Sequence, residues 1–195
     1  MTTPTEVLIE VARVLEDLQI PYVVVGSFAS SARGVRRATI DADIVAQLTA
    51  DHVDEIVDKL SLRDFYVDDQ AAQRAIASGR AFNAIHRESM FKINIYASQD
   101  EFSKKEMERK LPEKILRDSE TIVYIATAED TVVAKLSWFR KGGDVSDRQW
   151  SDVLGVLKVQ QARLDYEYMR EWAERLGVRD LLEKAIAAAS PSSIM

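Results

Sequence analysis

The 195-residue sequence contains no cysteine and only two histidines. The lack of cysteine excludes disulfide bonds and thiolate metal sites, and two histidines argue against a histidine metal cluster. Long apolar runs are also missing. The apolar stretch at 22–25 is far too short to span a membrane, and no basic segment precedes an apolar core at the N-terminus. We therefore expect a cytoplasmic protein without a membrane segment.

The formal net charge of −6 argues against nonspecific coating of nucleic acid, because that binding mode depends on a basic surface and on counterion release. A local basic patch remains compatible with this charge. Arg33, Arg36 and Arg37 cluster in the sequence, and Arg140 and Lys141 form a second pair. These groups either guide a triphosphate or a tRNA end, or form an ordinary solvated face.

The pattern of apolar residues predicts an α/β (α+β) fold with a mixed sheet flanked by helices and a helical C-terminal part. Apolar residues make up 47% of the chain, which is ample for one sizeable core. We expect a core domain at 1–126 and a helical region packed on it at 127–195. The predicted strands are 21–26, 39–45, 81–86, 90–97 and 120–126; the predicted helices are 7–18, 28–33, 50–60, 69–78, 147–160, 166–176, 179–189 and one that opens at 127.

A Gly-Ser turn follows the first predicted strand. Ser27 stands where a helix N-cap residue would accept hydrogen bonds from the free amides of the next turn. Gly26 leaves room for a polyphosphate, which a helix start can hold with its N–H donors and its positive dipole end. The alternative is an ordinary turn from a strand into a helix.

Two aspartates lie in the next predicted strand. Because side chains alternate along a strand, Asp41 and Asp43 face the same side, with roughly 7 Å between their Cα atoms. Both can reach one Mg²⁺, and a second Mg²⁺ could share a carboxylate. The alternative is that they form the wet face of a half-exposed strand, since short motifs match by accident. The order of strand, Gly-Ser turn, short helix and Asp-x-Asp strand favours metal-dependent chemistry on a nucleotide.

The residues Val25-Gly26-Ser27 and Asp41-Ala42-Asp43-Ile44 resemble the signature of the minimal nucleotidyltransferase fold. The wider pattern is similar to the AbiEii-type branch, which includes toxins of some bacterial toxin–antitoxin systems. It is carried by 37–43, by 128–130 ahead of Lys135, and by 148–153, and it spans about residues 20–182.

The resemblance implies Mg²⁺-assisted transfer of a nucleotidyl group from a nucleoside triphosphate to an acceptor that is RNA or tRNA, a protein or a small molecule. It also implies an antitoxin as a partner. Gly26, Ser27, Arg37 and Lys135 would bind the nucleotide, and Asp152 would complete the pocket. Without the resemblance, Lys135 reads as a helix lysine whose stem covers apolar surface, and Asp152 as a surface acid.

Asn94 departs from the family pattern, which commonly has a third carboxylate on a later central strand. Its amide can lend an oxygen to a metal or bond a substrate hydroxyl, but it cannot take a proton as a general base. A catalytically impaired nucleotide-binding or partner-binding module of the same fold therefore stays open. Lys92 shares the strand face and either binds phosphate or is an exposed sheet lysine.

Three tryptophans, at 138, 150 and 172, could stack a base. Each lies on an apolar helical stripe, so we expect all three to pack in the core.

Overall fold

The computed structural model describes residues 2–116 and 121–190 and divides into two units. The first, called the sheet unit here, comprises Met1–Val25 and Thr39–Ala126; the second, called the helical unit, comprises Gly26–Ala38 and Thr127–Met195. The segment after the first strand thus belongs to the helical unit, although it is inserted between two strands of the sheet. The predicted domain division at 126/127 stays a prediction.

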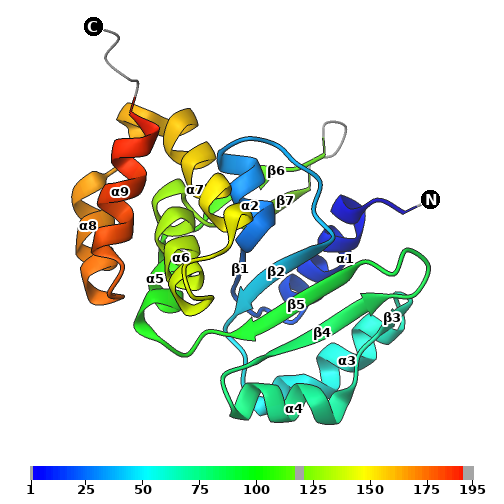
Figure 1. The fold of residues 1–195 in the computed structure, drawn as a ribbon. Coiled ribbons are helices and arrows are strands. Elements are labelled where there is room, and N and C mark those ends of the chain that lie inside the picture. Colours follow the sequence, from blue (N-terminus) through cyan, green and yellow to red (C-terminus); the bar gives the residue numbers. More distant parts are fainter. Residues whose placement is uncertain (1, 117–120, 191–195) are drawn as a thin grey trace, which may run out of the picture. The chain divides into compact units, whose positions relative to one another are not determined.

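One mixed sheet is built from the seven strands of the described residues, in the order β3-β4-β5-β2-β1-β7-β6 (Figure 1). β1 pairs antiparallel with β2 and parallel with β7, while β2 pairs parallel with β5. The strands are β1 (Tyr22–Val25), β2 (Asp41–Ala46), β3 (Phe65–Tyr66), β4 (Ala81–His86), β5 (Lys92–Ala97), β6 (Leu111–Lys114) and β7 (Ile122–Ile125). The predicted α/β class with a mixed sheet is confirmed.

The two central strands that carry the polar motif have one apolar face. Ala42 and Ile44 on β2 and Ile93 and Ile95 on β5 have no exposed surface. The alternate residues point to the opposite face and are only partly buried; they are 41 and 43 on β2, and 92, 94 and 96 on β5. Burial of one face fixes the register, since a slip of one residue would expose every apolar side chain.

Helices of the sheet unit begin where the sequence supplies an N-cap. Thr3 forms a capping box with Glu6, and Asp68 and Asp100 each accept a backbone N–H from the first turn that follows. These helices are α1 (Pro4–Asp17), α3 (Val53–Ser61, after a 3₁₀ turn at Ala50–His52), α4 (Asp69–Ala77) and α5 (Glu101–Arg109).

The regular structure of the helical unit consists of helices alone within its described residues. Thr127, Ser146 and Asp165 cap three of them in the same way. The helices are α2 (Gly26–Arg33), α6 (Ala128–Lys141), α7 (Asp147–Gln160), α8 (Tyr166–Arg175) and α9 (Arg179–Ala189). Across residues 2–116 and 121–190, none of the helices combines the length and the apolar character that a membrane span needs.

Among the described residues, two strands and one α-helix were not predicted from the sequence. β3 has only two residues, α5 is mostly charged, and β6 contains a proline, so none shows a clear apolar period. The strand predicted at 120–126 starts at Glu120, which lies outside the described residues, and the observed strand is Ile122–Ile125.

The segment after α2 lies directly against α7. The Gln160 side chain donates to the Arg33 carbonyl, and a Cβ added at Gly34 would lie 2.8 Å from the Val156 backbone nitrogen. Only glycine allows this approach, because a real Cβ would overlap the α7 backbone. Glycine at this position thus sets how closely the segment approaches the helix.

Replacing Gly34 with alanine is therefore expected to lower the free energy of unfolding by about 1–3 kcal/mol, the usual cost of overpacking. Urea denaturation measures this change. Gly142→Ala is the matched control, because Gly142 has an ordinary φ of −85° and an added Cβ would meet nothing closer than 3.4 Å. Equal stability of the two variants would contradict the close approach.

Candidate functional site

The sheet unit brings the two predicted carboxylates and Asn94 together. In the parallel pair of β2 and β5, Asp41 lies opposite Lys92 and Asp43 lies opposite Asn94. Asn94 Nδ2 donates to Asp43 Oδ1 at 2.8 Å and lies 3.5 Å from Asp41 Oδ2. One amide therefore contacts both carboxylates, which strand alternation places on the same face of the sheet.

Two more side chains of β5 border this group. Lys92 Nζ lies 4.0 Å from Asp41 Oδ2, and both side chains are partly exposed, so this ion pair is weak. The pKa of Tyr96 is raised, first by burial and then by the negative charges of Asp43 and Asp41. Strand alternation from Asn94 is the signal that places Tyr96 on this face, although no role was predicted for it.

The donor set of this face fits a hard divalent cation. Carboxylate and amide oxygens are the ligands that Mg²⁺ takes, and Mg²⁺ keeps waters or adds substrate phosphates for its remaining positions. Within the described part of the chain, no group of three or more His, Cys, Asp or Glu side chains is placed to hold a metal ion. The residues that would hold such a cation are thus Asp41 and Asp43, which supply two carboxylates. Asn94 would offer its oxygen only after its side-chain amide rotates by about 180°, because its Nδ2 donates to Asp43.

The Gly-Ser turn differs from its prediction in one detail. α2 begins at Gly26, whose φ of +64° turns the chain from strand into helix, so Ser27 lies inside the first turn and is not the N-cap. The Ser27 hydroxyl instead accepts a hydrogen bond from Arg37 Nη2 at 2.9 Å. Val25, the last residue of β1, is the strand partner of Asp43 and directly precedes Gly26 in the chain.

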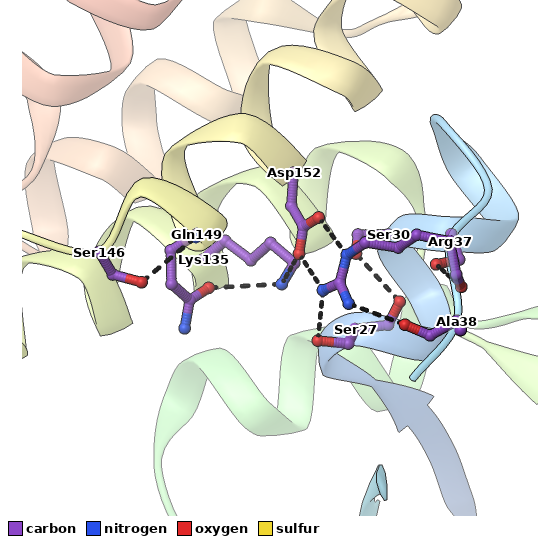
Figure 2. Close-up of polar contacts among 9 residues, drawn as sticks. Ser27, Ser30, Arg37, Ala38, Lys135, Ser146, Gln149 and Asp152 are labelled. Carbon is purple, nitrogen blue, oxygen red and sulfur yellow. Dashed lines mark hydrogen bonds and ion pairs between the residues drawn. The ribbon is translucent and has the colours of Figure 1, made fainter. Parts of the chain in front are cut away.

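In the helical unit, Arg37, Lys135 and Asp152 form one ion cluster (Figure 2). Arg37 binds Asp152 with two donors, Nε to Oδ1 at 2.8 Å and Nη2 to Oδ2 at 2.6 Å. Lys135 Nζ lies 2.9 Å from Asp152 Oδ2 and donates to Gln149 Oε1 at 3.3 Å. Gln149 was not predicted, although it lies three residues before Asp152 on α7, a spacing that places both on one helix face.

Two members of this cluster are largely buried. The Lys135 and Asp152 side chains are only 5% and 8% exposed, so neither is an ordinary surface residue. Burial acts to raise the pKa of Asp152, but hydrogen bonds from Arg37 and Lys135 outweigh it and lower the pKa to about 2. Asp152 is therefore ionised at neutral pH and is a poor general base. With two cations and one anion, the cluster carries a formal charge of +1.

The prediction that all three tryptophans pack in the core is wrong for one of them. Trp172 is buried and Trp150 is half-buried, with its ring centroid 5.5 Å from that of Phe139. Trp138 is 53% exposed, and Lys141 Nζ lies 4.8 Å from its ring centroid. A cation over an indole ring stabilises this exposed position, which an apolar stripe alone does not reveal.

The mixed sheet with its flanking helices is the fold of solved nucleotidyltransferase-like structures. The chain is similar to an antigenic nucleotidyltransferase-like protein from Paracoccidioides brasiliensis, with 16% identity, a TM-score of 0.57, and coverage of 95% of this chain and 93% of that one.

Two antibiotic-related structures are also similar. ANT(2'')-Ia in complex with adenylyl-2''-tobramycin has 11% identity and a TM-score of 0.57, covering 92% of this chain and 99% of that one. The lincosamide antibiotic adenylyltransferase LnuA with lincomycin bound has 11% identity and a TM-score of 0.51, covering 81% and 98%. No protein-family model and no curated protein matches the chain. At these identities the likeness establishes the fold, and the AbiEii-type branch stays a prediction.

The pKa of Asp152 predicts how stability depends on pH. Because the folded-state pKa of about 2 lies below the ordinary value of 3.8, the ionised group stabilises the fold above pH 4 and loses this effect as the pH falls toward 2. Asp152→Asn should therefore lower the free energy of unfolding on the order of 2 kcal/mol at pH 7, and the gap to the wild type should narrow between pH 4 and pH 2.

Urea denaturation across this pH range measures the gap. Asp147→Asn removes an exposed acid from the first turn of the same helix and serves as the control. A gap that is the same at pH 7 and pH 2.5 would show that Asp152 is not held by the two cations.

Proposed function

We propose that this protein transfers a nucleotidyl group from a nucleoside triphosphate to a hydroxyl acceptor with Mg²⁺ bound at Asp41 and Asp43. The observation that carries the proposal is the pairing of these two carboxylates on one sheet face by Asn94. The nucleotidyltransferase-like fold supports the same reaction class. The positively charged Arg37–Lys135–Asp152 cluster beside the Ser27 hydroxyl supports binding of a polyphosphate.

Each group has a separate task in this reaction. When bound, Mg²⁺ would supply positive charge that stabilises the reacting phosphate oxygens. The Gly26 turn leaves its backbone open to the β and γ phosphates, and the Ser27 hydroxyl donates to one of their oxygens. Lys135 offsets negative charge of the triphosphate, and Arg37 donates to the Ser27 hydroxyl. Asp152 keeps both cations in place and does not act as a base.

The chemistry balances without a further reactant. The acceptor oxygen forms a bond to the α phosphorus, the bond from that phosphorus to the bridging oxygen breaks, and pyrophosphate leaves. The hydroxyl proton passes to water or to a carboxylate, because the Asn94 amide cannot take it.

Nucleotide binding is expected to depend on the carboxylate pair. Isothermal titration calorimetry with each nucleoside triphosphate and Mg²⁺ should give metal-dependent binding to the wild type and at least a tenfold weaker affinity for Asp41→Ala combined with Asp43→Ala, because the metal anchor is gone. Asp51→Ala removes an exposed acid of the same unit and should leave the affinity unchanged. Metal-independent binding, or equal binding by the double variant, would count against the proposal.

A second function is favoured by a specific observation, the amide at position 94. A protein that has kept the fold but lost turnover would bind nucleotide or a partner without transferring anything. In that case Asn94 would only neutralise the repulsion between Asp41 and Asp43, to which it donates.

Asn94→Asp separates the two functions. If the wild type is a transferase, label from an α-³²P-labelled triphosphate should reach an acceptor in total RNA or cell extract, and Asn94→Asp should change the rate by less than about tenfold. If the wild type is a binder, only Asn94→Asp should label an acceptor, since a third carboxylate supplies a metal ligand and a base.

The toxin role, the antitoxin partner, an RNA or tRNA acceptor and the cytoplasmic location rest on the sequence alone and stay predictions. An adjacent antitoxin gene would favour the toxin role.

A further inference from the structure

We propose that Arg37 is a positioning residue, which orients the Ser27 hydroxyl as a hydrogen-bond donor toward the triphosphate instead of binding the phosphates itself. This inference rests on the proposed function, because it concerns how that triphosphate is held. It replaces the simpler expectation that Arg37 is a direct phosphate ligand.

The first step is the placement of Arg37 along α7. Gln160 bonds the Arg33 carbonyl, Gly34 lies against the backbone at Val156, and Asp152 binds Arg37. The three α7 positions 152, 156 and 160 are four residues apart, so they form one face of the helix. The segment 33–37 is thus held at three successive points, and Arg37 reaches its site from a fixed backbone.

The second step is the fixed orientation of the guanidinium group. Nε and Nη2 bind the two oxygens of Asp152, Nη2 also binds Ser27 Oγ, and Nη1 donates to the Ala38 carbonyl at 3.3 Å (Figure 2). A planar guanidinium group that binds a carboxylate along one edge and two further acceptors with its remaining donors has little rotational freedom. Lys135 limits it further, since its ammonium group holds Asp152 from another direction at 2.9 Å.

The third step concerns the hydrogen of Ser27. A guanidinium group has donors only, so Ser27 Oγ must be the acceptor of this bond, and its own hydrogen points away from Arg37. Across residues 2–116 and 121–190, that hydrogen has no protein acceptor, and the Ser27 side chain is partly exposed. A hydroxyl that accepts from a cation is also polarised and becomes a stronger donor to an anion.

The result is a chain of contacts from Lys135 through Asp152 and Arg37 to Ser27, which ends in a donor directed away from the cluster. Within it, Asp152 and Arg37 act on the triphosphate through Ser27. This arrangement predicts that removing Arg37 causes no further loss of triphosphate affinity once the Ser27 hydroxyl has been removed.

A double-mutant cycle tests this inference, with inorganic tripolyphosphate and Mg²⁺ as the probe, since the base of the nucleotide is not needed. Calorimetry should show about tenfold weaker binding for Ser27→Ala and for Arg37→Gln. The double variant should also be about tenfold weaker, and not about a hundredfold weaker as for two independent contacts. Thermal unfolding of all four proteins, followed by circular dichroism, checks that each is folded.

Arg37→Lys gives a second, independent readout. Lysine keeps the charge but cannot bind Asp152 with two donors and Ser27 with a third, so it should weaken binding as much as Arg37→Gln. Arg36→Gln removes one exposed charge from the same segment and should bind like the wild type. This control separates local orientation from the loss of general positive charge.

Additive losses in the cycle, or full affinity in Arg37→Lys, would overturn the inference, because Arg37 would then contact the phosphates directly or act only by its charge. The proposed function survives that outcome. If the wild type binds neither tripolyphosphate nor any nucleoside triphosphate in the presence of Mg²⁺, the proposed function fails, and the inference is overturned with it.

Discussion

The polar cluster of the helical unit depends on the ion pairs that the buried Asp152 carboxylate forms. It lies between Arg37 and Lys135, and its side chain is 8% exposed. A buried charge of this kind is tolerated only where partners compensate for lost solvation, and the two cations do so strongly enough to lower the pKa of Asp152 to about 2. Removing it would leave two cations competing for the remaining polar groups.

In the sheet unit, the neutral side-chain amide of Asn94 lies between two carboxylates and contacts both. A third carboxylate beside Asp41 and Asp43 would add repulsion, whereas the amide donates toward both. The amide also removes a possible general base from this face, because it does not accept a proton at neutral pH. In the proposed reaction, this face would hold a cation and would rely on another group for proton removal.

The sequence predicted the alternation within β2 and within β5, so that Asp41 and Asp43 share one face and Asn94 shares a face with Lys92 and Tyr96. The parallel pairing of the two strands, which brings Asn94 opposite Asp43, was not predicted, because periodicity within a strand does not determine its partner. It could not predict that Asp152 would reach Arg37 across 115 positions, since that contact depends on helix packing. Short or charged elements such as β3 and α5 lacked an apolar period. The start of α2 was predicted two positions too late, with Ser27 as its N-cap, whereas the helix already begins at Gly26, which has a positive φ.

The measurement that tests the account most directly is the identity of the phosphate product that the wild-type protein releases from a nucleoside triphosphate with Mg²⁺, total RNA and cell extract. Nucleotidyl transfer predicts pyrophosphate, in an amount equal to the nucleotide joined to the acceptor, and no release by Asp41→Ala. Transfer of the γ phosphate with release of a nucleoside diphosphate, hydrolysis to orthophosphate, or pyrophosphate release that Asp41→Ala retains, would contradict it.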